Sequence, residues 1–224
     1  MKPETVKRLI NTPAIIMFVS ISAMLQAQSR SDGTMPQYLF ENFSGGDILM
    51  KSGQVQNRIL NYNTVTGKMV YTSEEKYYNL LNPDLIDTVY MQNEKFIPFG
   101  SAFCQLLLSG RINLYLQTQG KVLPPGKPAA YGGTSQVSAS NYVSNISISG
   151  EYANLPLPAD FQVRNSKTYW LRIDNEWLDF TTEKQFLKLF PDKEAALKAY
   201  IKNNRIKTEK PETIVNLVKF CSGL

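Results

Sequence analysis

The chain has 224 residues, of which 43% are hydrophobic and 11% aromatic, so it is long enough to bury a full-sized core. It contains 24 Lys or Arg and 19 Asp or Glu, which gives a formal net charge of +5. It contains no histidine, which excludes Ser-His-Asp and Cys-His catalysis, His-ligated zinc sites and histidine pH switches.

The N-terminus has the organisation of a secretory signal peptide. Basic residues within the first eight positions precede an apolar run of twelve residues, Ala14 to Leu25, and Gln26-Ala27-Gln28 follows it. As a helix the run would be about 18 Å long, short of the roughly 30 Å hydrocarbon core that the alternative, an uncleaved anchor, must cross. We therefore predict a signal peptide over 1–27 and an exported mature chain without a transmembrane span, located in the periplasm, at the outer membrane or outside the cell.

The segment from Asp47 to Thr118 predicts consecutive β-hairpins. Short β-type runs alternate with turn residues such as Ser52-Gly53 and Thr66-Gly67. Connections this short favour antiparallel neighbours, because parallel strands need long crossovers. We expect a curved antiparallel sheet or a partly closed barrel, with strands at 47–51, 54–62, 68–72, 77–81, 86–91, 95–99, 103–108 and 111–117.

Residues 119–150 are rich in Pro, Gly, Ser and Asn and predict a long loop. Its aromatic residues Tyr131 and Tyr142 are candidate partner contacts, and the alternative is a solvated, flexible excursion. Two further strands are expected at 168–173 and 176–180, with Trp170 and Trp177 in the core.

The C-terminal residues predict three short amphipathic helices. Thr182-Glu183-Lys184-Gln185 matches a capping box, Asp192 can cap a second helix, and Pro211 suits the first turn of a third. The predicted fold class is therefore α+β, with a β-rich domain over 28–181 and a helical segment over 182–224 docked on the sheet.

The positive charge is concentrated in the helical segment. Residues 182–224 contain nine Lys or Arg and five Asp or Glu. This face could bind an anionic surface of the envelope, whereas export argues against nucleic acid; the alternative is an ordinary solvated helix face. The candidate binding residues here are Lys198, Lys202, Arg205 and Lys207.

The chain has two cysteines, Cys104 in an apolar stretch and Cys221 near the C-terminus. Export makes a disulfide between them chemically possible, and it would tie the last helix to the sheet. The alternative is two buried free thiols.

No motif predicts a catalytic residue, a metal site or a cofactor. Gly120 and Gly126-Lys127 do not form a phosphate loop, because their spacing is wrong and Pro128 replaces the required Ser or Thr. The acidic groupings that could act as an acid and base pair or hold calcium are Asp84 with Asp87, and Asp174 with Glu176 and Asp179.

Three stretches carry a family resemblance: Leu60–Val70, Gly126–Ser135, and Phe186–Pro191 running into Lys202–Lys207. They resemble a family of exported proteins of Bacteroidota-type Gram-negative bacteria to which no activity is assigned. The resemblance implies an envelope location, and it implies no substrate, cofactor or site residue.

Three functions remain open from the sequence. The first is a non-enzymatic binding module of the cell envelope whose partner is an envelope protein or an anionic surface. The second is a hydrolase that uses a carboxylate pair, which requires a cleft and at least one buried acid. The third is a carrier of a small apolar ligand inside a partly closed barrel, which requires an internal cavity.

Overall fold

The computed structural model describes residues 35–123, 127–128, 134–135, 157 and 161–224. The signal peptide predicted over 1–27 lies outside these residues. Those described all belong to one compact unit spanning 33–224.

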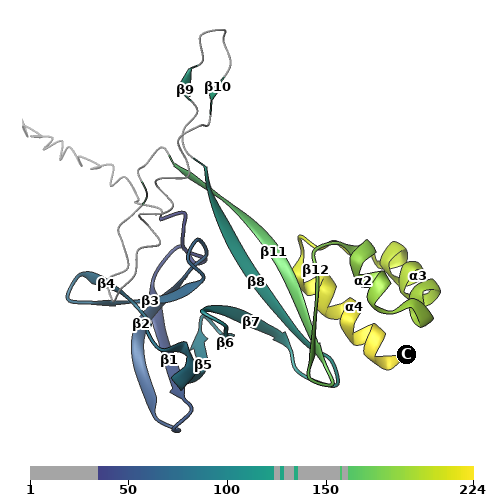
Figure 1. The fold of residues 1–224 in the computed structure, drawn as a ribbon, viewed down its shortest axis with the longest axis horizontal. Helices are drawn as coiled ribbons and strands as arrows, with labels where there is room; N and C mark the ends of the chain where they lie inside the picture. The colour runs from purple at the N-terminus through teal and green to yellow at the C-terminus, as the bar shows by residue number, and fades with distance from the viewer. Residues whose placement is uncertain (1–34, 124–126, 129–133, 136–156, 158–160) are drawn as a thin grey trace, which may run out of the picture. The chain divides into compact units, whose positions relative to one another are not determined.

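A ten-stranded antiparallel sheet forms the body, in the order β12-β11-β8-β7-β6-β5-β1-β2-β3-β4, and it is not closed (Figure 1). This confirms the predicted α+β class and the curved antiparallel sheet. The strands are β1 (Ser44–Met50), β2 (Val55–Asn63), β3 (Lys68–Ser73), β4 (Lys76–Asn79), β5 (Ile86–Met91), β6 (Glu94–Phe99), β7 (Ala102–Leu108), β8 (Asn113–Leu123), β11 (Gln162–Ile173) and β12 (Glu176–Phe180).

Two meanders share this sheet. The first runs β1 to β4, and the chain then returns through a short 3-10 turn, η1 (Pro83–Leu85), so that β5 pairs with β1 instead of β4. The second meander runs from β5 to β8 and continues through β11 to β12. The β1–β5 pairing brings together residues that lie more than thirty positions apart in the sequence. The candidate functional site lies across this pairing.

The strands β8 and β11 are longer than predicted. They pair without interruption from Leu123↔Gln162 to Asn113↔Arg172, so the first five residues of the predicted loop 119–150 belong to a strand. The polar and glycine-rich composition favoured a loop, but the partner strand satisfies the backbone hydrogen bonds of this segment regardless of its side chains. Within the predicted loop the structure also describes a short hairpin, β9 (Lys127–Pro128) with β10 (Thr134–Ser135).

The C-terminal helices are α2 (Glu183–Leu189), α3 (Glu194–Asn204) and α4 (Pro211–Gly223). Thr182 caps α2 in the predicted capping box with Gln185, and Pro211 occupies the first turn of α4 as predicted. The expected cap at Asp192 is wrong. This residue lies within a 3-10 turn, η2 (Pro191–Lys193), and α3 begins only after that turn, without a side-chain cap.

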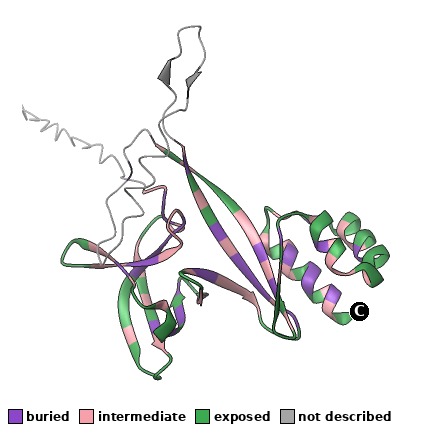
Figure 2. Cartoon of the chain, viewed as in Figure 1, coloured by how far each residue is buried: buried purple, intermediate pink, exposed green. Residues whose placement is uncertain are grey.

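The helices pack on the part of the sheet formed by β8, β11 and β12. Buried side chains from these strands and from all three helices form one apolar cluster, visible as the buried residues of α4 and the neighbouring strands in Figure 2. Leu114 and Leu116 of β8 supply this cluster. Its members include Ile112, Leu114, Leu116, Tyr169, Leu171, Phe180, Phe186, Leu197, Ile214, Leu217 and Val218.

A second cluster fills the curved part of the sheet. Its buried residues come from β1, β2, β3, β5, β6 and β7. The turn between β2 and β3 reaches across this cluster to β7 and β8: the Phe103 amide donates to the Gly67 carbonyl at 3.0 Å, and the Gly120 amide donates to the Thr64 carbonyl at 2.9 Å. The Tyr62 hydroxyl adds a hydrogen bond to the Phe103 carbonyl at 3.1 Å.

The two tryptophans do not join either main cluster. Trp170 and Trp177 contact Phe99, with ring centroids 4.9 and 5.0 Å apart, and Trp177 also contacts Tyr115 at 4.9 Å. Trp177 remains 37% exposed. The predicted core position is therefore wrong for Trp177, because β12 is an edge strand and this face of the strand is not covered by the helices.

Candidate functional site

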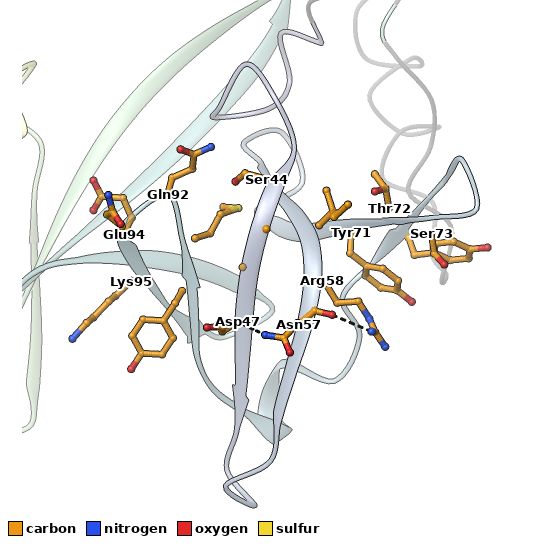
Figure 3. A pocket seen from close by; sticks show the side chains of 17 residues that line it. Ser44, Asp47, Asn57, Arg58, Tyr71, Thr72, Ser73, Gln92, Glu94 and Lys95 are labelled. Atoms are coloured by element: carbon orange, nitrogen blue, oxygen red, sulfur yellow. Dashed lines mark hydrogen bonds between the residues drawn. The ribbon is translucent and has the colours of Figure 1, made fainter.

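A groove formed by both meanders, where β1 pairs with β5, is the candidate site. It is open to solvent, has a volume of about 1230 Å³ and is lined by residues of the strands β1 to β6 (Figure 3). Its lining combines four charged residues, three tyrosines, and amide and hydroxyl side chains. A concave surface that combines aromatic rings with a few convergent polar groups is the usual form of a ligand site.

One row of side chains crosses four strands of this site. In the register of the sheet, Lys95 on β6 is opposite Tyr90 on β5, Tyr90 is opposite Asp47 on β1, and Asp47 is opposite Asn57 on β2. Directly opposed residues point to the same face of a sheet. The Asn57 amide donates to the Asp47 carboxylate, and the Lys95 ammonium lies 5.7 Å from the centroid of the Tyr90 ring.

A second group contains Arg58, Tyr71 and Tyr78. The two tyrosine rings are opposed across β3 and β4 and stack with centroids 5.3 Å apart and an interplanar angle of 19°. The Arg58 guanidinium lies 5.8 Å from the Tyr71 centroid and also donates to the Asn57 carbonyl at 3.1 Å. Arg58 follows Asn57 on β2, and Tyr71 is opposite Leu60, so this group points to the other face of the sheet from the row described above.

The sequence of β1 and β2 explains why the groove is open. Gly45 and Gly46 contribute no side chains, and a Cβ added at Gly45 would meet no atom within 4 Å. The first half of β2 lacks the strict alternation of a half-buried strand and leaves the apolar side chain of Ile59 51% exposed. An exposed aliphatic residue beside charged and amide groups offers a ligand both apolar and polar contacts.

The sequence-predicted binding residues do not line this groove. Lys198 and Lys202 lie exposed on α3, Arg205 ends that helix in a left-handed conformation, and Lys207 is exposed after it. Tyr131 and Tyr142 lie outside the described residues. The predicted role of these six residues in binding stays a prediction.

The cysteines are both buried and both free. The structure therefore does not contain the disulfide considered from the sequence. It contains two buried free thiols, which was the alternative. Burial raises the pKa of the Cys104 thiol to about 12, so this side chain is a weak nucleophile near neutral pH.

The carboxylates considered for hydrolysis are all exposed: Asp84, Asp87, Asp174, Glu176 and Asp179. The buried acid that the hydrolase hypothesis requires is not found among them. Within the described part of the chain there is also no group of three or more Cys, Asp or Glu side chains placed to hold a metal ion.

The carrier hypothesis does not gain support either. The sheet has two free edges, β12 and β4, and the curved region is filled by the second apolar cluster. None of the helices in the described ranges combines the length and the apolar character needed to cross a membrane.

None of the residues that line the groove is among the binding residues predicted from the sequence. The lining residues come from segments that the register of β6, β5, β1 and β2 brings together, and no local pattern predicts that β5 pairs with β1. Two signals were present: the Gly45-Gly46 pair and the segment 54–59 at the start of β2, whose residues are exposed except for the half-buried Gln56.

No protein-family model, curated protein or solved structure matches the chain. The resemblance to exported Bacteroidota-type proteins therefore stays a prediction, and the groove is interpreted from its own chemistry.

Proposed function

We propose that this chain is an exported, non-enzymatic binding module of the cell envelope, and that the groove over the strands β1 to β6 is its binding surface. The observation that carries the proposal is the row of Lys95, Tyr90, Asp47 and Asn57, which presents a tyrosine ring, an amide and two opposite charges on one face of the sheet within the groove of about 1230 Å³. Export is inferred from the N-terminal sequence pattern alone.

Binding is favoured over hydrolysis because of how the acidic groups lie. Asp47 is the acid at the centre of the groove, and it is exposed and hydrogen-bonded to Asn57. A general acid needs a raised pKa, which an apolar, desolvated surrounding provides. An exposed carboxylate that accepts a hydrogen bond from an amide suits ligand recognition instead.

The proposal is tested by brief crosslinking in the native cells, affinity purification of the tagged protein and mass spectrometry of the eluate. The same run reads the mature N-terminus, which we expect at Gln28. We expect reproducible recovery of an envelope component by the unchanged chain and loss of that component with Ile59→Glu, which places a charge in the groove.

Leu85→Glu is the matched control, because Leu85 is an aliphatic residue 57% exposed outside the groove. Recovery that is equal for the unchanged chain and Ile59→Glu would contradict the proposed surface. An N-terminus at Met1 would contradict export.

A further inference from the structure

We infer that the ligand of the groove is an uncharged carbohydrate chain. This inference rests on the proposed function and adds the chemical class of the ligand. Four features of the groove support it: the aromatic rings, the polar partners, the charge balance and the size.

The aromatic rings suit the apolar faces of sugar rings. Tyr90 is 38% exposed and lies in the row with Asp47 and Asn57, whereas the stacked rings of Tyr71 and Tyr78 lie on the opposite face of the sheet. Tyrosine presents an apolar ring with a polar end, and it loses little conformational entropy on binding. A pyranose ring likewise has an apolar C–H face and a polar rim, so it can lie on such a ring and hydrogen-bond at its edge.

The polar groups suit hydroxyls, which donate and accept at once. The Asp47 carboxylate accepts only, whereas the Asn57, Gln92 and Asn93 amides both donate and accept. Asp47 and Asn57 are adjacent across β1 and β2, and they are hydrogen-bonded to each other at the β2 end of the row (Figure 3). Two adjacent planar groups of this kind match two neighbouring hydroxyls of one sugar.

The charges of the groove balance. Its lining contains two acidic residues, Asp47 and Glu94, and two basic residues, Arg58 and Lys95. Each basic side chain lies beside a tyrosine ring, at 5.8 Å for Arg58 and 5.7 Å for Lys95. An anionic ligand would need an excess of positive charge, as nucleic-acid and phosphate sites have. The balance therefore favours an uncharged ligand.

The size of the groove favours a chain of several units. Pockets for small molecules enclose their ligands in roughly 300–1,000 Å³. This groove exceeds that range at about 1230 Å³ and is open to solvent, and the row of Lys95, Tyr90, Asp47 and Asn57 crosses four strands within it. An open, extended surface admits an internal stretch of a polymer, whose two ends can continue beyond the protein.

The test uses the mature chain on an array of neutral and acidic glycans, followed by calorimetric titration with the glycans that bind. We expect binding to neutral glycans, weakened at least about tenfold by Tyr90→Leu and by Asn57→Ala, since losing one central contact commonly costs that much. Tyr90→Phe keeps the ring and should retain binding. Asn216→Ala is the control for the amide, because Asn216 is exposed on α4 and does not line the groove.

Binding to acidic glycans alone, binding to none, or neutral binding that Tyr90→Leu leaves unchanged would overturn the inference. Thermal unfolding of each variant separates lost binding from lost folding. If the carbohydrate result is negative and Ile59→Glu still abolishes recovery of an envelope component in cells, the ligand class is wrong and the proposed function stands. If both fail, the groove is not a binding site.

Discussion

At the scale of single residues, two glycines allow the β2–β3 turn to contact β7 and β8. Gly67 has a φ of 70°, and a Cβ added there would lie 2.9 Å from the Ala102 Cβ. A Cβ added at Gly120 would lie 2.5 Å from the Thr64 Oγ1 and 2.7 Å from a Val163 methyl group. The approach of the β2–β3 turn to β7 and β8 is therefore close at two positions where an added Cβ would crowd its neighbours.

Gly120→Ala is predicted to lower the free energy of unfolding by about 1–3 kcal/mol, because the added methyl overpacks the contact with Thr64. Gly110→Ala is the control: an added Cβ there meets no atom within 4 Å, and its effect should stay within about 0.5 kcal/mol. Urea unfolding of the two variants measures the difference, and equal stabilities would contradict the close approach.

The buried thiol of Cys104 predicts a pH dependence of stability. An unfolded cysteine has a pKa of about 8.5, whereas burial raises the pKa of Cys104 to about 12. The stability that this group contributes is therefore present in full below about pH 8.5 and is lost as the pH rises towards 12, at up to about 1.4 kcal/mol per pH unit.

Cys104→Ala removes that contribution, so its unfolding free energy should fall less steeply than that of the unchanged chain between about pH 9 and pH 11. Urea unfolding at a series of pH values makes the comparison; Tyr38 and Tyr169 are present in both proteins and cancel, whereas Tyr62 also loses the part of its raised pKa that Cys104 causes. Parallel curves would show that the thiol is not buried as described.

At the scale of elements, local patterns predict what local interactions determine. The hairpins follow from turn residues between β-type runs, and α2 follows from its capping box, in which the Gln185 amide donates to the Thr182 hydroxyl at 3.3 Å. The ends of β8 and β11 could not be predicted, because residues such as Gly120 and Asn165 have low strand propensity and are held by pairing with each other.

Thr182→Ala is predicted to destabilise the protein by about 1 kcal/mol, because the substitution leaves an amide at the start of α2 without its side-chain acceptor. Asn216→Ala, on the exposed face of α4, should change stability by less than about 0.5 kcal/mol. Chemical denaturation with a helix-sensitive probe tests both, and an unaltered midpoint for Thr182→Ala would argue against the cap.

At the scale of the whole described unit, one sheet supports two apolar clusters that meet at β7, which contributes side chains to both. Leu217 on α4 is fully buried in the helical cluster. Leu217→Ala should cost about 2–5 kcal/mol, and the loss should appear in a single transition because the strands are continuous across the border. Two separate transitions, followed by circular dichroism and tyrosine fluorescence, would show that the clusters unfold independently.

The candidate site emerges only at this scale. Lys95 and Asn57 lie 38 positions apart in the sequence, and they belong to one row because β5 returns to pair with β1. The sequence correctly predicted the strands that carry them. It could not place them together, since the register of non-consecutive strands is set by long-range packing.

Site-specific photocrosslinking in the native cells tests whether the groove is the binding surface. A photoreactive amino acid replaces Ile59 in the groove and, in a separate chain, Leu85 outside it; both side chains are more than half exposed. We expect a crosslinked product from position 59 and none from position 85. A product from position 85 alone, or from neither position, would contradict it.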